Sequence, residues 1–308
     1  MARERTVNLT SRERVLFPEA GVTKGDLFEY YGAVAPAILP HLRDRPFTLK
    51  RYPHGIDGEV YFQKQVPRGA PAWLPTRQFT THPREGGSRQ VDFALLNSRE
   101  AVLWAVQVNC IDMNAWYSRV DRPGHPDFVL FDLDPPDGGF AQAVRVAHLI
   151  RELLDEVGLP GYVKTSGADG IHVLAPIARR AGYEQTYDFA EVAARLLEAR
   201  HPGLVTTEWL KRKRPAGAVL VDHRQNGWGK TIASVYSVRP RPTAPVSTPL
   251  DWGELDESLD PASLGMPEAL ERIERRGDLL APVLEAKQPL GAAARRLAKL
   301  EADIVRDR

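Results

Sequence analysis

The second half of the chain alternates between strand-like and helix-like hydrophobic patterns. Short apolar runs flank two longer segments in which apolar residues recur every three or four positions, the period of an amphipathic helix. The first of these segments has a stop signal at Gly158 and Pro160. The pattern predicts strands at 127–135, 161–167, 170–177 and 218–226, with helices at 140–158 and 183–202. This strand–helix–strand–strand–helix–strand order is typical of the split βαβ, or ferredoxin-like, fold.

The first half of the chain predicts an additional α/β layer. An amphipathic pattern over residues 24–42 predicts a helix that is interrupted at Pro36. The further expected elements are paired strands at 47–53 and 59–65 around the turn 54–58, a polar loop at 80–90, a helix over 98–116, and a strand-like run at 230–239.

Composition limits the function classes only weakly. With 41 Lys and Arg against 40 Asp and Glu, the net charge is near zero, so any binding to nucleic acid must come from local clusters. One cysteine, Cys110, excludes a disulfide framework, and no apolar stretch is long enough to span a membrane. We therefore expect a cytoplasmic protein with one catalytic domain over residues 1–290 and a helical tail over 291–308.

Two aspartates close the apolar run that is expected to form the first core strand. In a strand, Asp132 and Asp134 point to the same face, and Pro135 and Pro136 end the ladder. Such a pair is either a solvated turn or half of a divalent-metal site. In the ferredoxin-like order the last strand can lie beside the first. Asp222 would then complete a carboxylate triad.

Groups that could bind phosphate lie on the neighbouring predicted elements. Lys164, Ser166 and His172 flank a glycine-containing turn whose backbone N–H groups could hold an anion. Lys230 begins the strand-like run 230–239, and Arg239 and Arg241 follow at an i, i+2 spacing that places both on one strand face. On one sheet surface with three aspartates, these residues predict a metal-dependent nucleotidyl-transfer centre, in which two ions clamp the attacking and leaving oxygens.

The motifs "FDLDPPDG", "VKTSGADGIHV" and "DHRQNGWGKTIASVYSVRPRP" together resemble the polymerase domain of bacterial DNA ligase D, the non-homologous end-joining polymerase. That domain belongs to the archaeo-eukaryotic primase superfamily. The resemblance covers about residues 8–275 and leaves no ligase or phosphoesterase segment, as in a stand-alone version or an excised domain. It implies an α+β primase-polymerase fold, in which a ferredoxin- or RRM-like catalytic core packs with an N-terminal α/β layer.

The resemblance also implies roles for individual residues. The residues implied to bind metal and to act in catalysis are Asp132, Asp134 and Asp222. The residues implied to bind the incoming nucleotide are Lys164, Ser166, His172, Gln225, Lys230, Arg239 and Arg241. The residues implied to bind the 5′-phosphate of the DNA are Arg14 and Lys24, with Ser11 beside them. Those implied to contact the template strand are Lys50, Arg51 and Phe62. The loop 80–90 stands where the family has a hairpin that brings DNA ends together.

The implied activity is the template-dependent addition of nucleotides, with ribonucleotides favoured over deoxyribonucleotides, to primer 3′ ends at breaks or short gaps that carry a 5′-phosphate. Two Mn²⁺ or Mg²⁺ ions are the implied cofactors, NTPs or dNTPs the substrates, and gapped or broken DNA the partner. A separate ATP-dependent DNA ligase and the Ku protein are further possible partners, and the bacterial nucleoid is the expected location.

Two departures from the family pattern keep alternatives open. Ser11 replaces an asparagine common in relatives, and Asn114 replaces a histidine that some relatives carry near the metals. The alternatives are a gap-filling excision-repair polymerase or primase of the same superfamily, and a catalytically weak module that bridges DNA ends. The basic run 211–214 either is a solvated loop or binds phosphate groups of the template.

Overall fold

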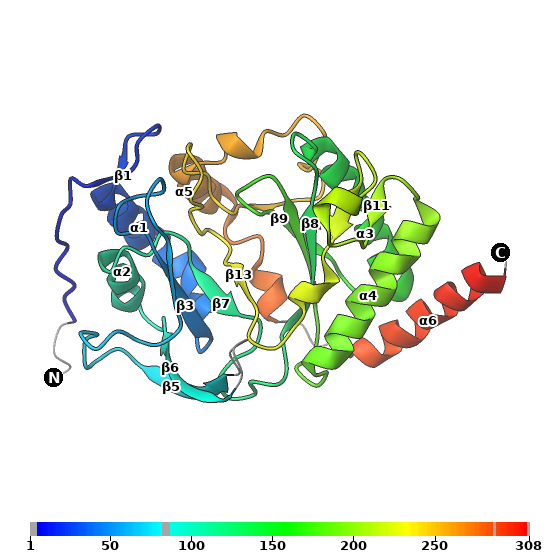
Figure 1. Cartoon of the computed structure of the whole chain (residues 1–308), viewed down its shortest axis with the longest axis horizontal. Coiled ribbons are helices and arrows are strands. Elements are labelled where there is room, and N and C mark those ends of the chain that lie inside the picture. Colours follow the sequence, from blue (N-terminus) through cyan, green and yellow to red (C-terminus); the bar gives the residue numbers. More distant parts are fainter. Residues whose placement is uncertain (1–4, 82–86, 286–287, 307–308) are drawn as a thin grey trace. The chain divides into compact units, whose positions relative to one another are not determined.

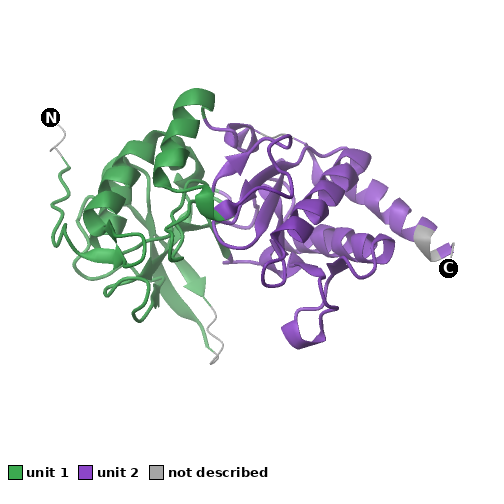
Figure 2. Cartoon of the chain, turned by 90° about the horizontal axis from the view of Figure 1, so that it is seen from above, with its two compact units in different colours: residues 1–121, 231–247, 262–277 green, residues 122–230, 248–261, 278–308 purple. Residues whose placement is uncertain are grey.

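The computed structural model describes residues 5–81, 87–285 and 288–306. The chain forms two compact units that each contain three chain segments (Figure 2). Unit 1 comprises residues 1–121, 231–247 and 262–277, and unit 2 comprises residues 122–230, 248–261 and 278–308. Whether the two units act as the single predicted domain over residues 1–290 stays a prediction.

Unit 2 contains the ferredoxin-like core. Its elements, in chain order, are β8 (Phe128–Asp134), α3 (Phe140–Val157), β9 (Tyr162–Thr165), β10 (Ile171–Pro176), α4 (Tyr183–Arg200) and β12 (Val219–Val221). The strands lie in the order β12-β8-β10-β9, with every neighbouring pair antiparallel. The outer positions of the sheet are taken by β11 (Val205–Thr206) and β14 (Pro249–Leu250). The predicted order of elements is confirmed, and β12, the last strand of the core, lies beside β8.

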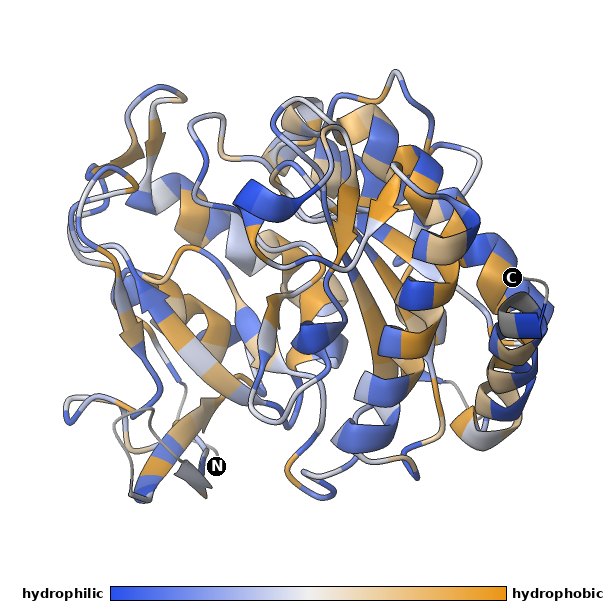
Figure 3. Cartoon of the chain, turned by 45° about the vertical axis from the view of Figure 1, so that its right-hand side comes forward, coloured by the Kyte–Doolittle hydropathy of each residue, from blue (hydrophilic) through white to orange (hydrophobic). Residues whose placement is uncertain are grey.

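The core strands and helices form for the reasons that the pattern indicates. Strand β8 alternates between a fully buried face that includes Leu133 and a face that carries Asp132 and Asp134. Helices α3 and α4 both pack on β8, and their polar sides face away from it (Figures 1 and 3). Gly158 caps the C-terminus of helix α3, and its φ of +78° is the left-handed conformation that glycine adopts without strain.

The C-terminal helix α6 (Leu290–Arg306) packs on α4 and α3. It buries Leu290, Ala293 and Leu297, which recur at helical spacing along one side. Nη1 of Arg296 donates a 2.8 Å hydrogen bond to the carbonyl of Val157, the last residue of α3. The predicted tail is therefore a helix docked on unit 2.

Unit 1 contains a second antiparallel sheet. Its order is β13 (Thr231–Ala233), β7 (Asn114–Trp116), β3 (Pro46–Arg51), β6 (Arg89–Leu95) and β5 (Thr76–Thr81), and β4 (Tyr61–Gln63) also pairs with β3. Strands β1 (Val15–Phe17) and β2 (Val22–Thr23) form a separate hairpin. The helices of this unit are α1 (Lys24–Leu42), α2 (Arg99–Gln107) and α5 (Met266–Arg276). Short 3₁₀ helices elsewhere are η1 (Lys211–Lys213), η2 (His223–Gln225), η3 (Pro261–Ser263) and η4 (Ala281–Leu284).

The predicted interruption of the first helix at Pro36 is wrong. Helix α1 continues through Pro36 from Lys24 to Leu42. A proline in a helix leaves the carbonyl four residues earlier without its N–H donor. Here that carbonyl belongs to Gly32, and Nε of Arg99 donates to it at 3.0 Å. The side chain thus replaces the missing bond, which the sequence pattern does not reveal.

Two other elements are shorter than predicted. The helix expected over 98–116 ends at Gln107, because Asn109 takes a left-handed φ of +65°, and the chain then forms β7. The strand expected over 230–239 ends at Ala233. There the N–H of Ser237 bonds to the carbonyl of Ser234, and Tyr236 takes a φ of +63°, so the chain turns.

The predicted end-bridging loop 80–90 lies partly outside the described residues. Strands β5 and β6 form the hairpin that flanks it, with Thr80 paired to Gln90 and Thr81 to Arg89. Within the described part of the chain, no helix has the length and apolar character needed to cross a membrane.

Candidate functional site

Three carboxylates meet at one end of the unit 2 sheet. Asp132 and Asp134 lie on β8, and Asp222 directly follows β12. Strand pairing sets this arrangement, because the N–H of Asp222 donates a 2.8 Å bond to the carbonyl of Asp132. One oxygen of each carboxylate lies within 4.8 Å of the other two. The predicted triad is therefore present.

The electrostatics of the triad disfavour three free negative charges. Desolvation, followed by the charges of Asp132 and Asp222, raises the pKa of Asp134 to about 7, while the cation of Arg214 opposes the shift. The Asp222 carboxylate also accepts the N–H of Arg224 at 3.1 Å and so caps the short helix η2. Carboxylate oxygens at this spacing suit a hard divalent cation such as Mg²⁺ or Mn²⁺.

A lysine and a histidine continue the site across the sheet. His172 on β10 pairs with Asp132 on one side and with Lys164 on β9 on the other. Its Nε2 lies 3.2 Å from Oδ1 of Asp132, and its Nδ1 lies 2.7 Å from Nζ of Lys164. The His172 and Lys164 side chains are both buried. The three strands thus align a cation, an imidazole and a carboxylate in one row.

The turn after Lys164 is held in a tight conformation. The hydroxyl of Ser166 accepts the N–H groups of Ala168 and Gly170, each at 3.1 Å. Gly170 passes so close to β8 that an added Cβ would lie 2.3 Å from the carbonyl oxygen of Leu133. Only glycine fits there. The expected turn is present beside the triad, and its role in binding phosphate stays a prediction.

Two further predicted nucleotide ligands, Gln225 and Lys230, lie in unit 2. Nε2 of Gln225 lies 3.4 Å from Oδ2 of Asp222, and the side chain of Lys230 is exposed. Arg239 and Arg241 lie in unit 1, beyond the end of β13, and belong to neither sheet. The prediction that all these cations share one sheet surface with the aspartates is therefore wrong for the two arginines.

The predicted 5′-phosphate residues come together in unit 1. Arg14 donates from Nη1 to the carbonyl of Pro53 at 2.9 Å and from Nη2 to the Ser11 hydroxyl at 3.4 Å. Lys24, the first residue of α1, is buried and donates from Nζ to the carbonyl of Gln107 at 2.7 Å. Burial and then the charge of Arg14 lower the pKa of Lys24 to about 8. An exposed guanidinium beside a buried ammonium is a pair of cations that suits a phosphate group.

The predicted template residues lie on the paired strands β3 and β4 of unit 1. Phe62 on β4 is 72% exposed, which is unusual for a phenylalanine, and Nζ of Lys50 lies 5.5 Å from its ring centroid. Arg51 is tied down by bonds from Nε to the carbonyl of Val108 and from Nη1 to Oε1 of Gln63. An exposed ring beside a lysine suits base stacking and phosphate neutralisation.

Two polar residues that contact the predicted site residues were not themselves predicted. Asp112 is 1% exposed, and its Oδ2 lies 3.1 Å from Nζ of Lys50 and 4.0 Å from Nε of Arg239. Gln107 accepts Lys24 through both its carbonyl and its side-chain oxygen. The signal for Asp112 was a charge inside an otherwise apolar run. Asn114, the noted departure, lies on β7 and donates from Nδ2 to the carbonyl of Asp112 at 3.1 Å.

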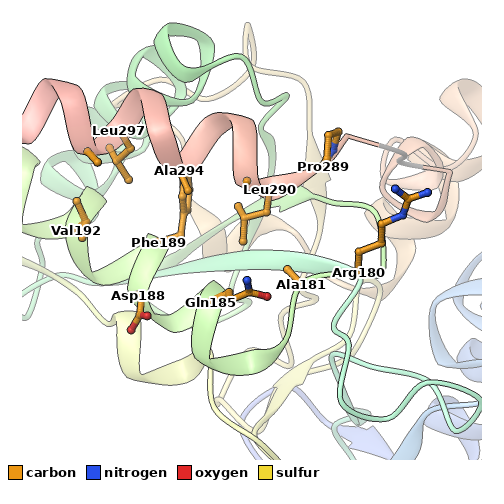
Figure 4. Close-up of a pocket in the computed structure, with 12 residues that line it drawn as sticks. Arg180, Ala181, Gln185, Asp188, Phe189, Val192, Pro289, Leu290, Ala294 and Leu297 are labelled. Atoms are coloured by element: carbon orange, nitrogen blue, oxygen red, sulfur yellow. The ribbon is translucent and has the colours of Figure 1, made fainter.

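An apolar cavity of about 370 Å³ lies in unit 2 between α4 and α6 (Figure 4). Phe189 and Val192 of α4 face Leu290, Ala294 and Leu297 of α6 across it. Its lining contains none of the residues predicted from the sequence. The cavity belongs to the packing of α6 rather than to the carboxylate site.

Comparisons with known proteins identify the family. A family model described as "LigD, primase-polymerase domain" matches residues 23–280. The multifunctional non-homologous end joining protein LigD of Mycolicibacterium smegmatis is 36% identical over 295 residues, which cover 94% of this chain and 37% of that protein. The bifunctional non-homologous end joining protein LigD of Bacillus subtilis is 31% identical over 273 residues, which cover 88% of this chain and 43% of that protein.

A solved structure is similar over almost its whole length. The polymerase domain from Mycobacterium tuberculosis ligase D, determined in complex with DNA, matches with a TM-score of 0.84 and 36% sequence identity. The match covers 92% of this chain and 99% of that chain. By contrast, this chain spans less than half the length of the curated LigD relatives named above.

The fold and the carboxylate site define an enzyme of the primase-polymerase class, a nucleotidyltransferase. The chain belongs to the LigD primase-polymerase domain family. The resemblance seen in the sequence and the predicted fold class are confirmed. The roles of the individual side chains stay predictions.

Proposed function

We propose that this protein adds nucleotides to the primer 3′ end at DNA breaks or short gaps that carry a 5′-phosphate, in end-joining repair. The observation that carries the proposal is the triad of Asp132, Asp134 and Asp222, joined through His172 to the cation of Lys164. This arrangement places groups that suit metal ions and groups that suit phosphate oxygens side by side. The names of the relatives support the assignment to end joining.

The donor set of the triad fits divalent metal. Three carboxylates lie within 4.8 Å of one another, and desolvation together with their mutual repulsion raises the pKa of Asp134. Asp132, Asp134 and Asp222 would hold the ions. Bound there, two Mn²⁺ or Mg²⁺ ions would supply Lewis-acid stabilisation of the attacking and leaving oxygens in an in-line displacement.

The other residues of unit 2 would bind and orient the nucleoside triphosphate. The ammonium of Lys164 would neutralise charge on the triphosphate, and the imidazole of His172 would keep that ammonium in place. The hydroxyl of Ser166, which accepts two N–H groups of its own turn, would donate its proton to a phosphate oxygen. Gln225, beside Asp222, would contact the nucleotide or its sugar, and Lys230 would add a further cation.

The remaining predicted residues are cations and an aromatic ring that lie in unit 1. Arg239 and Arg241 would contact the triphosphate, and we infer that Arg14 and Lys24 bind the 5′-phosphate beyond the gap. Phe62 would stack on a template base while Lys50 and Arg51 contact the template backbone. The further partners we propose are a separate ATP-dependent DNA ligase and Ku, in the bacterial cytoplasm at the nucleoid.

The test is primer extension on a gapped duplex with a 5′-phosphate. Ribo- and deoxynucleotides are given separately, with manganese or magnesium, to the wild type and to Asp132→Ala. The expected result is incorporation in the wild type, more efficient with ribonucleotides and manganese, and none in the variant. DNA binding without incorporation under every condition would overturn the proposal and favour a module that bridges DNA ends. Equal extension with and without the 5′-phosphate would favour a primase.

A further inference from the structure

A buried carboxylate in unit 1, Asp112, has no role in the proposed function. Asp112 is 1% exposed, and its neighbours Cys110 and Ile111 are buried as well. Burying a carboxylate costs free energy unless both oxygens are satisfied. Oδ1 of Asp112 accepts no hydrogen bond from the described residues. Burial with one oxygen unsatisfied does not favour stability. We therefore look for the function of Asp112 in the residues that it contacts.

Both charged partners of Asp112 are residues of the proposed substrate site. Oδ2 accepts a hydrogen bond from Nζ of Lys50 at 3.1 Å, and the same oxygen lies 4.0 Å from Nε of Arg239, which is an ion-pair distance rather than a hydrogen bond. The two cations come from segments far apart in the chain, β3 and the turn beyond β13. Each side chain is 20% exposed, so each cation reaches from a buried anion toward solvent.

The link continues to the surface through Lys50. Its Nζ lies 5.5 Å from the ring centroid of Phe62, its cross-strand neighbour, and 5.7 Å from that of Tyr52. Tyr52 is buried, whereas Phe62 is exposed. The ammonium is therefore fixed between a buried carboxylate and an exposed ring. Any displacement of Asp112 would change the position of Lys50 beneath that ring.

We propose that Asp112 is a positioning residue that holds Lys50 and Arg239 in a fixed relation, so that the template contact and the triphosphate contact share one anchor. The proposal rests on the roles of Lys50 and Arg239 in the proposed function. Asp112 acts only through these two cations, because it is itself buried. Without its charge, both cations lose their common anion and take other rotamers. The incoming nucleotide and the template strand then bind more weakly together.

The test uses Asp112→Asn, which keeps the size of the side chain and removes its charge. Single-nucleotide insertion on a gapped duplex should show a KM for the nucleotide raised about tenfold, with kcat within about threefold of wild type. Binding of a single-stranded template overhang, measured by fluorescence without nucleotide, should weaken by a similar factor. The matched control is Asp127→Asn, because Asp127 is a buried carboxylate that lies 3.1 Å from Nε of Arg179 in unit 2. It should leave KM and overhang binding unchanged.

Equal KM and overhang binding in wild type and Asp112→Asn would overturn the inference, as would identical losses in both Asn variants. If Asp112→Asn does not fold, Lys50→Met and Arg239→Met replace it. Their effects on overhang binding should be non-additive, because both cations share one anion, and additive effects would overturn the inference. A wild type that never incorporates nucleotide would overturn the proposed function, while overhang binding still decides the role of Asp112.

Discussion

Nε2 of His172 lies 3.2 Å from Oδ1 of Asp132, across directly paired positions of β10 and β8. On its other side the imidazole accepts from Nζ of Lys164, because an ammonium can only donate. The proton of a neutral ring is thereby assigned to Nε2, where it can donate to the carboxylate. One imidazole thus orients a metal-suited carboxylate and a phosphate-suited cation at once.

Replacing His172 should therefore weaken nucleotide binding more than catalysis. In His172→Phe the ring volume remains and both nitrogens are lost, so buried Lys164 loses a charge-assisted hydrogen bond. We expect the KM for the nucleotide to rise about tenfold or more. Steady-state insertion kinetics measure this. His148→Phe, a histidine of α3 that bonds the carbonyl of Leu255, is the matched control and should not change KM. An unchanged KM in His172→Phe would contradict the assigned role.

Removing one charge from the triad should abolish incorporation. Asp132→Asn and Asp222→Asn each take away an anionic oxygen from the cluster, and we expect the single-turnover rate to fall by about 1,000-fold. DNA affinity should stay within about twofold of wild type, since the proposed template and 5′-phosphate contacts are made by other residues. Asp137→Asn is the control, because Asp137 lies three residues beyond Asp134 but is 95% exposed. A variant triad that retains the wild-type rate would contradict a catalytic role for these carboxylates.

Metal affinity should depend on pH through Asp134. The pKa of this carboxyl is about 7, so it is protonated below pH 7 and must lose the proton to bind metal. The affinity for Mn²⁺ should be about tenfold lower at pH 6 than at pH 8. Calorimetric titration at both values measures it. In Asp134→Asn the affinity should be weaker overall and nearly constant over this range.

The metal-free protein should show the matching effect on stability. The native pKa of Asp134 exceeds the ordinary value of 3.8, so between these values the native state binds more protons than the unfolded state. Its free energy of unfolding should therefore decrease as pH rises from about 4 to about 7. Urea unfolding at several pH values measures this, with Asp134→Asn as the control that lacks the contribution.

Recognition of a 5′-phosphate should weaken at alkaline pH. The pKa of Lys24 is about 8, so its charge is present below pH 8 and is lost as pH rises through this value. Competition binding of gapped duplexes with and without the phosphate measures the preference. Lys24→Ala should abolish the preference at every pH. Arg12→Ala, which removes a neighbouring exposed cation paired with Glu29, should preserve it.

The exposed ring of Phe62 should contribute to DNA binding and not to folding. Stacking on a base contributes about 1–3 kcal/mol, so Phe62→Leu should weaken binding to a template overhang by about 5-fold to 150-fold. The free energy of unfolding should change by less than about 0.5 kcal/mol, because the ring is exposed. Phe62→Tyr keeps the π face and should bind like wild type. Comparable binding by the leucine variant would exclude stacking.

The site on unit 2 could be predicted because it follows from local rules. The two-residue period of a strand places Asp132 and Asp134 on one face, and the ferredoxin-like order places β12 beside β8. Asp222 is then close by necessity. His172 and Lys164 follow from the same register, since each lies opposite its neighbour across the sheet.

The errors arose where tertiary contacts override the sequence pattern. Residues 230–239 alternate like a strand, but the left-handed Tyr236 turns the chain after Ala233 and takes Arg239 off the sheet. Pro36 reads as a helix breaker, yet Arg99 from another helix satisfies the exposed carbonyl. No periodicity predicts such a partner, because it depends on segments that meet only after folding.

The division of unit 1 among three chain segments has a consequence for synthesis on the ribosome. The sheet of unit 1 is complete only when Thr231–Ala233 pairs with β7, and this segment is made after every core strand of unit 2. The sheet of unit 1 therefore begins first but is completed only after the core strands of unit 2. The nascent chain must carry an open sheet edge at β7 while the carboxylate-bearing core is already translated.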